Sequence, residues 1–341
     1  FFFRKPSCMV LFSCFFCSRP WLLWSWGGAA GILAGTGFLV HLNVLLNDWF
    51  GDFYNLIQKA LSKGDGAMEE AELYQELATV GWLCVTYIVV AIVLNFFTKH
   101  WCFRWRTALT QAYLVHWKRL RTVEGASQRV QEDSMRFATL TEHLGASAIE
   151  SCMSLIAFLP ILYGLSKNIT TIPIFGRVPH ALVWFTLLWA LLGTVVLAGA
   201  GRRLPGLEFQ NQLAEAALRK ELVYGEDEAN RETQAQAQHL YGSVQGNYYT
   251  LYKAFFQFDL WRQSYIQAGI ILPYVVLAPT VAAGGLSLGQ LQQIVRAFGQ
   301  VEGSLQFFVL NWGTVVELQS IYRRLRAFER GCKAGNDQVV F

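Results

Sequence analysis

Residues 181–201 read ALVWFTLLWALLGTVVLAGAG and contain no charged side chain. An apolar run of about 20 residues is long enough, as an α-helix, to cross the hydrocarbon core of a bilayer. The whole chain has the same character, because 53% of its 341 residues are hydrophobic and only 15% are charged. A typical soluble domain contains about 25% charged residues. The sequence therefore predicts an all-α, polytopic membrane protein rather than a soluble globule.

Further apolar runs occur along the chain. Together they predict about six transmembrane helices, over residues 21–47, 78–98, 146–166, 181–201, 260–283 and 290–320. The connections 99–145 and 202–259 are rich in lysine and arginine, whereas 48–77 and 167–180 contain few. By the positive-inside rule, both termini and the two long basic connections face the cytoplasm.

The long basic connections are themselves helical in pattern. Within residues 104–124, large apolar side chains recur at every fourth position, at Trp105, Leu109, Tyr113 and Trp117. This spacing places them on one face of a helix. We therefore expect the transmembrane helices to continue into the cytoplasm as long extensions that pack on one another.

Carboxylates are concentrated directly after residues 181–201. The stretch 204–232 reads LPGLEFQNQLAEAALRKELVYGEDEANRE. At about 100° per residue, Glu208, Glu215 and Glu226 point within about 20° of one another if the stretch is one continuous helix, whereas Glu221 points elsewhere.

Two interpretations of this acidic face stay open on spacing alone. In the first, the face is solvated and Glu215 forms an ordinary ion pair with Arg219, four residues later. In the second, the face lines a cavity that opens to the cytoplasm. Partial loss of water favours the protonated form of a carboxylate, so such a face could carry protons.

Ionisable residues also occur in or near the other predicted spans. Glu142 lies just before the third span, Glu150 lies inside it, and Glu317 lies in the inner half of the sixth. Such groups normally face a bundle interior or a water-filled cavity, so Glu150 and Glu317 are either functional or neutralised by an arginine. Asp259 and Arg262 are expected to form a structural ion pair at the start of a helix.

Several chemical functions have no support in the sequence. There is no GxxxxGK[ST] phosphate-binding motif, so we expect no bound ATP. GLSLG at 285–289 matches the GxSxG motif of hydrolases, but it falls in a tight turn between two predicted spans instead of between a strand and a helix. We predict no enzymatic activity and no catalytic residue.

Metal and nucleic-acid binding are not supported either. Six histidines and seven cysteines show no metal-ligand spacing beyond the isolated CxxC of Cys14 and Cys17, which we interpret as small apolar residues. The net charge of +4 is modest and lacks a basic block. No metal, cofactor or nucleic-acid partner is therefore expected.

Four stretches carry a resemblance to a known family. They are NDWFGDFYNLIQKAL (47–61), FRWRTALTQAYLVHWKRLRTVEGASQRVQEDSMRFA (103–138), LPGLEFQNQLAEAALRKELVYGEDEANR (204–231) and VVELQSIYRRLRAFE (315–329). The chain resembles, from about residue 17 to 330, the SbmA/BacA family of bacterial inner-membrane peptide transporters. Its QRVQED and YRRL elements also resemble the transmembrane half of ABC exporters, whose fold that family shares.

The resemblance implies a homodimer in the bacterial inner membrane that encloses a central cavity. It implies import of proline-rich antimicrobial peptides and peptide-derived antibiotics, driven by the proton gradient without ATP. Some members also affect very-long-chain fatty acids of envelope lipid. By motif match, the proton-coupling residues are Glu142, Glu215 and Glu226, with Glu208, Glu150 and Glu317 as secondary candidates.

The resemblance also suggests a domain organisation. Residues 1–20 form an N-terminal membrane-associated segment, 21–330 the transmembrane transporter domain and 331–341 a short cytoplasmic tail, with no nucleotide-binding domain. Arg4 and Lys5 precede a short apolar run as in a signal peptide, but no small-residue cleavage site follows. Some members carry a further N-terminal hydrophobic helix, and here FFFRKPSCMVLFSCFFC (1–17) precedes the region of resemblance.

Two other functions remain open. The chain could be the membrane half of an ABC transporter whose ATPase is a separate subunit, with a docking groove near residues 121–132 or 222–229. Alternatively, it could be a non-transporting membrane scaffold related to envelope lipid, in which the glutamates form a solvated face. Preferred cargo, proton stoichiometry and resting conformation do not follow from the sequence.

Overall fold

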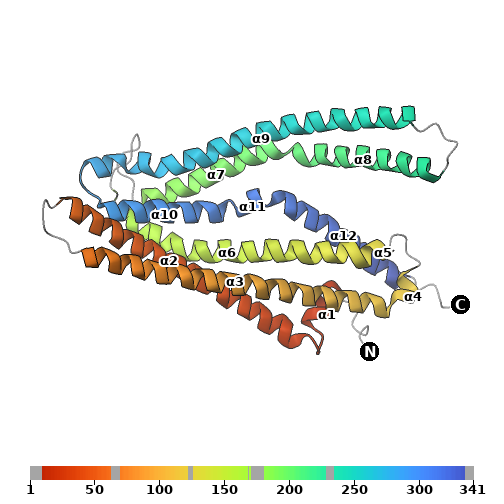
Figure 1. Cartoon of the computed structure of the whole chain (residues 1–341), viewed down its shortest axis with the longest axis horizontal. Helices are drawn as coiled ribbons and strands as arrows, with labels where there is room; N and C mark the ends of the chain where they lie inside the picture. The colour runs from red at the N-terminus through yellow and green to blue at the C-terminus, as the bar shows by residue number, and fades with distance from the viewer. Residues whose placement is uncertain are drawn as a thin grey trace. The chain divides into compact units, whose positions relative to one another are not determined.

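The computed structural model describes residues 10–62, 70–121, 126–167, 169, 180–227 and 234–334, without the side chains of 227, 234, 308, 309 and 331–334. All regular elements in these ranges are helical (Figure 1). They are α1 (Val10–Phe16), η1 (Leu23–Gly27), α2 (Gly28–Ser62), α3 (Glu70–Val115), α4 (Trp117–Leu120), α5 (Ala126–Gln128), η2 (Arg129–Asp133), α6 (Ser134–Ser166), α7 (Ala181–Gly201), α8 (Leu204–Asp227), α9 (Gln234–Ala282), α10 (Leu288–Leu305), α11 (Phe307–Leu310) and α12 (Trp312–Ala334).

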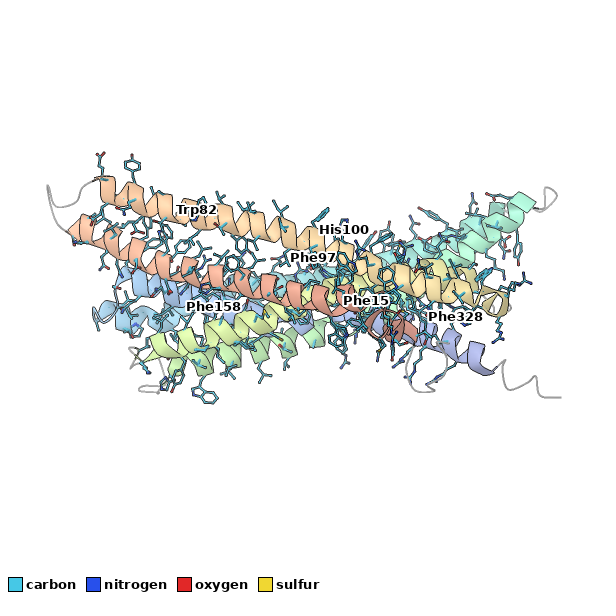
Figure 2. The ribbon with its side chains drawn as sticks, turned by 90° about the horizontal axis from the view of Figure 1, so that it is seen from below. Phe15, Trp82, Phe97, His100, Phe158 and Phe328 are labelled. Carbon is cyan, nitrogen blue, oxygen red and sulfur yellow. The ribbon has the colours of Figure 1, made fainter. Side chains whose placement is uncertain are left out.

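The all-α polytopic fold is confirmed. Within the described residues, five helical regions are long and apolar enough to cross a membrane: Leu23–Ser62, Glu70–Val115, Ala126–Ser166, Ala181–Glu226 and Ala235–Ala282. They overlap the first five predicted spans. No residue in the most apolar stretch of α3 is fully buried, and Figure 2 labels Trp82 of this helix, which is 73% exposed.

The sixth predicted span differs from the prediction. Residues 290–320 fall on α10, α11 and α12, which are interrupted at Gln306 and Asn311. At both interruptions the side-chain amide bonds the preceding turn: Gln306 Nε2 donates to Glu302 Oε1 at 3.0 Å, and Asn311 Nδ2 donates to the carbonyl oxygen of Phe307 at 3.0 Å. The N–H groups of Gln306 and Asn311 still donate to the carbonyl oxygens of Glu302 and Phe307, at 3.1 Å each, and the hydropathy of the region does not indicate either interruption.

Several helices are longer than a membrane requires. Helix α3 has 46 residues and α9 has 49, which at 1.5 Å per residue gives about 70 Å each. The hydrocarbon core is only about 30 Å thick. The prediction of long helical extensions is therefore confirmed, whereas their cytoplasmic location stays a prediction.

The chain divides into two compact units. The first comprises residues 1–183 and 277–341, in which α10 packs on α2 and α6, and α2 packs on α3. The second comprises residues 184–276, which hold most of α7, all of α8 and most of α9 as an antiparallel hairpin. In this hairpin the Tyr265 hydroxyl donates to the carbonyl oxygen of Trp189 at 3.3 Å, and the two rings stack with centroids 5.0 Å apart.

An aromatic core surrounds the C-terminal half of α3. Trp105, Leu109 and Tyr113 are all buried, as their four-residue spacing predicted. Helix α3 ends at Val115, so Trp117 belongs to the separate helix α4 and is only half-buried. Phe15 of α1, labelled in Figure 2, stacks on Trp105 with ring centroids 6.1 Å apart. Residues 122–124 of the predicted helix lie outside the described ranges.

A buried carboxylate ties the first and last described helices together. Glu329 Oε1 of α12 accepts hydrogen bonds from the Leu11 N–H at 3.0 Å and from the Tyr113 hydroxyl at 3.1 Å. Trp105 Nε1 in turn donates to the carbonyl oxygen of Leu11 at 2.9 Å. Helices α1 and α12 therefore meet at one end of the first unit, whereas the side of the membrane on which the termini lie stays a prediction.

The same region explains the isolated CxxC. Burial, with a smaller contribution from the nearby Glu329 carboxylate, raises the pKa of the Cys14 thiol to about 12. Cys14 is half-buried and Cys17 is exposed, so the interpretation of both as small apolar residues stays a prediction, as does the membrane association of residues 1–20.

The GxSxG match forms the cap of a helix. Ser287 is the N-cap of α10, where its Oγ accepts from the Gln290 N–H at 3.2 Å. Gly284, with φ of +69°, makes the preceding turn. Asn55 Oδ1 of α2 accepts from the Gly289 N–H at 3.0 Å, so α2 also caps α10. This arrangement gives Ser287 a structural role.

Gly289 allows α2 and α10 to approach closely, which generates a stability prediction. A Cβ at this position would overlap the Gly51 carbonyl oxygen and the Asn55 side chain. We expect Gly289→Ala to cost about 1–3 kcal/mol and to lower the Tm of the detergent-purified protein by several degrees. The matched control is Gly303→Ala in the same helix, where a Cβ meets open space. Equal Tm values for the two variants would contradict this packing.

Candidate functional site

The predicted acidic face lies on one continuous helix. Helix α8 runs unbroken through Leu204–Asp227, after a turn at Arg202 and Arg203 that separates it from α7. Glu208, Glu215 and Glu226 therefore share one face, within about 20° of rotation, and all three side chains are exposed. We call these three residues the acidic row.

Helix α8 has one buried side. Its buried or half-buried residues follow one another at steps of four, seven and three positions: Leu207, Asn211, Leu218 and Glu221. On α9, Val244 and Leu251 are buried seven residues apart. This is the heptad spacing of packed antiparallel helices. The acidic row lies about 90° around α8 from this buried stripe, so it borders the helix interface without being covered by it.

The expected ion pair on the acidic face is not formed. Among the residues that the structure describes, neither Glu215 nor Arg219 takes part in an ion pair, although they lie one helical turn apart. The Glu215–Arg219 ion pair is therefore not supported, but the exposure of all three carboxylates fits a solvated face. Both interpretations of the acidic row stay open. Carboxylates without cationic partners are available to bind protons or a cationic ligand.

Glu142 lies in the other unit. It is a half-buried residue of α6, one turn after Ala138, whose carbonyl oxygen accepts from the Cys102 thiol at 2.9 Å. The Glu142 carboxylate is an electrostatic neighbour of that thiol. Because the acidic row belongs to the second unit, a shared cavity for Glu142, Glu215 and Glu226 stays a prediction. Glu150, also on α6, is exposed and has no polar partner among the described residues.

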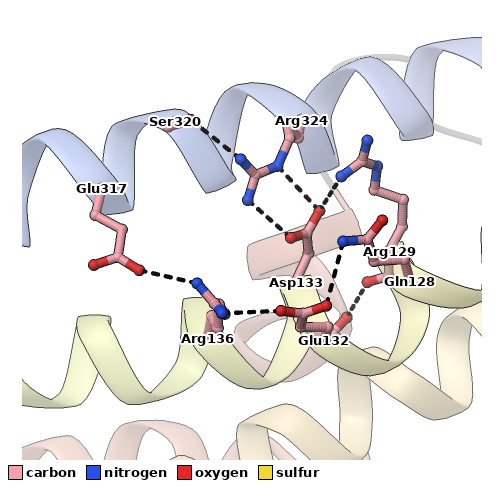
Figure 3. A network of polar contacts seen from close by, with 9 residues as sticks. Gln128, Arg129, Glu132, Asp133, Arg136, Glu317, Ser320 and Arg324 are labelled. Carbon is pink, nitrogen blue, oxygen red and sulfur yellow. Dashed lines mark hydrogen bonds and ion pairs between the residues drawn. The ribbon is translucent and has the colours of Figure 1, made fainter. Parts of the chain in front are cut away.

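Glu317 is paired with an arginine. Arg136 Nη1 lies 3.5 Å from Glu317 Oε1, and Arg136 Nη2 lies 3.0 Å from Glu132 Oε1 (Figure 3). All three side chains are 41–50% exposed, so each pair contributes little to stability. This geometry favours the interpretation of Glu317 as a neutralised residue over that of a proton carrier.

The sequence did not predict the most buried ionic cluster of this network, which is centred on Asp133. The Asp133 side chain is only 2% exposed and lies 2.6 Å from Arg129 Nη1. Arg324 of α12 reaches it with two atoms, Nη2 at 2.9 Å from Oδ1 and Nε at 3.3 Å from Oδ2 (Figure 3). Arg129 and Asp133 are visible in the sequence as a pair four residues apart, but nothing in the spacing indicates Arg324. This cluster fastens η2 to α12.

The structure also tests a minor prediction about an ion pair. Asp259 Oδ1 and Arg262 Nη1 lie 3.7 Å apart, so the predicted ion pair is confirmed. It lies in the middle of α9 and not at a helix start, because α9 begins 25 residues earlier, at Gln234. Within the described ranges, no group of three or more histidine, cysteine or acidic residues could hold a metal ion.

These features define a class of protein: an α-helical, polytopic membrane protein with charged and polar clusters beyond its apolar spans. The chain belongs to the SbmA/BacA-like family, which matches residues 18–333. It is 25% identical over 88% of its length to the "inner membrane ABC transporter ATP-binding protein YddA" of Escherichia coli (strain K12). The name of this relative is that of an inner-membrane ABC transporter protein.

Other relatives carry similar names. The chain is 25% identical over 94% of its length to an "uncharacterized ABC transporter ATP-binding protein" of Synechocystis. It is 24% identical over 87% of its length to the "ABC transporter D family member 2, chloroplastic" of Arabidopsis thaliana. The matches cover 56%, 48% and 41% of these three relatives. The chain thus spans about half the length of the curated relatives it matches.

The Asp133 cluster generates the second stability prediction. Asp133→Asn leaves two guanidinium groups facing one another without their carboxylate, so we expect a loss of about 2–4 kcal/mol and a clear drop in Tm. Glu132→Gln, the neighbouring substitution at an exposed ion pair, should cost less than about 1 kcal/mol. Thermal unfolding of both variants in detergent makes the comparison. A Tm for Asp133→Asn as high as that of Glu132→Gln would show that the cluster is not stabilising.

Proposed function

We propose that this chain imports peptides across the bacterial inner membrane as a homodimer, driven by the proton gradient. The observation that carries the proposal is the acidic row, three exposed carboxylates without ion-pair partners on one face of a continuous helix in a membrane transporter. The resemblance to peptide transporters of this family supplies the substrate class. Both termini and the helical extensions lie in the cytoplasm in this proposal.

Protonation of the acidic row provides a driving force for conformational change. Glu208 and Glu215 are separated by about 10 Å along the helix axis. Two charges at this distance repel by about 0.4 kcal/mol in water, but by about 1.7 kcal/mol at an effective dielectric constant of about 20. The larger value corresponds to a more than tenfold shift in an equilibrium. Neutralisation therefore matters most when the row lines a cavity with little bulk water.

The proposed cycle follows from these charges. A peptide enters the outward-open dimer, where the unprotonated carboxylates attract its positive charge. Glu142, Glu215 and Glu226 then take up protons from the outer side, which removes their mutual repulsion and their hold on the peptide. The neutralised state favours the inward-open conformation, from which peptide and protons leave to the cytoplasm. Glu208 lies on the same face and is a further candidate.

Peptide uptake into proteoliposomes tests the proposal. The purified protein is reconstituted without nucleotide, and entry of a fluorescent proline-rich peptide is followed under an imposed inward proton gradient. We expect uptake that an uncoupler abolishes and that Glu215→Gln and Glu226→Gln each reduce at least tenfold, because an amide cannot exchange a proton at these positions. The matched control is Glu72→Gln, an exposed glutamate in the first turn of α3, which should leave uptake unchanged.

The same assay can refute the proposal. If both glutamine variants import peptide at the wild-type rate, the acidic row is not the coupling site. If neither wild type nor variants import peptide under any gradient, the chain is not a proton-driven peptide importer, and a role in envelope lipid becomes the better hypothesis.

A second candidate is the membrane half of an ABC transporter with a separate ATPase. The observation in its favour is that the relatives are named ATP-binding proteins and are about twice as long as the matched region. An ATPase would dock near residues 121–132 or 222–229, of which 122–125 and 228–229 lie outside the described residues. This candidate predicts uptake only after addition of ATP and a partner subunit from native membranes, with no effect of an uncoupler.

A further inference from the structure

A half-buried arginine of α3 lies over a tryptophan ring of η1. The guanidinium carbon Cζ of Arg104 is 3.7 Å from the centroid of the Trp24 ring. At this distance the negative face of the ring attracts the cation. Within the described part of the chain, the Arg104 side chain makes no ion pair and no hydrogen bond. The guanidinium group is therefore held in place by an uncharged ring, and its positive charge is not compensated by a carboxylate there.

Several printed contacts fix Trp24 against α3. Trp101 Nε1 donates to the carbonyl oxygens of Trp24 at 2.9 Å and of Ser25 at 3.3 Å. The rings of Trp24 and Phe97, the latter labelled in Figure 2, have centroids 6.5 Å apart. Phe97, Trp101 and Arg104 follow one another at steps of four and three, so they share one side of α3. These contacts set the register between η1 and α3.

Arg104 lies just beyond the apolar part of α3. Residues 79–98 contain no charged side chain, and basic residues follow them. On the other helix, Arg19 precedes residues 21–40, which also contain no charged side chain. Tryptophan is enriched at membrane–water interfaces. Because Trp24 contacts Arg104, the two boundaries meet at one level, which corresponds to that of the phospholipid headgroups.

The exposed side of α3 next to Arg104 is apolar toward the membrane. Val89, Val93 and Phe96 are 54%, 61% and 65% exposed, and at about 100° per residue they lie within about 80° of Arg104 around the helix. We call these three residues the apolar tract. His100, labelled in Figure 2, lies between the tract and Arg104, with its ring centroid 4.2 Å from that of Phe96. A cationic group is thus continuous with a strip of apolar surface.

The length of this surface corresponds to one leaflet of a bilayer. From Val89 to Arg104 the distance along the helix axis is about 22 Å, at 1.5 Å per residue. A bilayer with its headgroups is about 40–45 Å thick, so one leaflet is about half of that. The apolar tract therefore lies at the depth of acyl chains when Arg104 lies at the depth of phosphate groups.

We propose that Arg104, held on Trp24, binds the phosphate of an anionic phospholipid whose acyl chains lie along the apolar tract. A guanidinium group can donate two parallel N–H bonds to phosphate oxygens. An acidic headgroup fits better than a zwitterionic one, because the headgroup itself has to supply the negative charge that balances Arg104. Basic sites next to transmembrane helices bind acidic headgroups in this way. The inference goes beyond the proposed function and does not rest on peptide import.

Two other occupants fit the surface less well. Free phosphate could pair with Arg104, but it gains nothing from the apolar tract. A second copy of this chain could cover the tract. The charged residues of α3 at this level are all basic, namely Lys99, Arg104 and Arg106, so a symmetric contact there would bring like charges together. An anionic phospholipid matches both the charge and the apolar surface.

Native mass spectrometry of the full-length protein in detergent tests the proposal. The protein is titrated separately with phosphatidylglycerol and phosphatidylcholine, and the fraction that carries one lipid gives each Kd. We expect wild type to bind phosphatidylglycerol at least tenfold more tightly than phosphatidylcholine. Arg104→Gln should weaken phosphatidylglycerol binding about tenfold and leave phosphatidylcholine binding unchanged. Arg104→Lys keeps the charge without the planar guanidinium group and should weaken phosphatidylglycerol binding about threefold.

Arg203→Gln is the matched control. Arg203 is an exposed arginine directly after the apolar run of α7, and no aromatic ring contacts its guanidinium group among the described residues. We expect this variant to change the Kd for phosphatidylglycerol less than about twofold, since a surface charge without a fixed position contributes less. Equal Tm values of wild type and Arg104→Gln would show that the substitution acts on binding and not on folding.

Three results would overturn the inference. The first is equal affinity of wild type for the two lipids, or of wild type and Arg104→Gln for phosphatidylglycerol. The second is displacement of phosphatidylglycerol by an equal concentration of inorganic phosphate, which would identify a site for a free anion. The third is normal lipid binding by Arg104→Gln with a changed oligomeric state in light scattering, which would identify a subunit contact. If Arg104→Gln does not fold, the comparison of Arg104→Lys with wild type decides, and equal affinities would overturn the inference.

The lipid assay and the uptake assay give independent answers. Wild type that binds phosphatidylglycerol selectively but imports no peptide would leave this inference standing and refute the proposed function. Wild type that imports peptide but binds both lipids equally would do the reverse.

Discussion

The fold depends on one constraint: a chain that crosses a bilayer must satisfy its backbone hydrogen bonds within each helix. Helices α3 and α9 have 46 and 49 residues, which is more than twice the number of residues needed to cross the hydrocarbon core. The parts beyond the membrane must then pack through side chains. The buried stripe of α8 and the aromatic core around Trp105 provide this packing.

The carboxylates fall into two groups according to what surrounds them. Asp133 and Glu329 are buried, and each receives hydrogen bonds from more than one helix, so they hold helices together. Glu208, Glu215 and Glu226 are exposed and make no ion pair among the described residues. Buried charges are tolerated when they are paired, whereas an unpaired charge in a mostly apolar protein calls for a ligand, a proton or water.

What the sequence predicted follows from local geometry. The acidic row needed only a continuous helix, and the buried face of Trp105, Leu109 and Tyr113 needed only a spacing of four. The contact between Asp133 and Arg324 could not be predicted, because it joins residues 191 positions apart and depends on the register between two helices. The interrupted sixth span was missed because hydropathy reports how apolar a stretch is but not where a helix is interrupted, as at Gln306 and Asn311.

The location of the candidate coupling residues limits how they could act together. Glu142 belongs to the first unit and the acidic row to the second, and the boundaries between the units fall inside α7 and α9. A helix transmits rotation and tilt along its length, since its backbone is rigid between breaks. Under the proposed function, protonation of the acidic row would therefore be felt by the first unit through α7 and α9. The turn at Arg202 and Arg203 is the described break between the acidic row and the apolar part of α7, so it is the place where such coupling would be weakest.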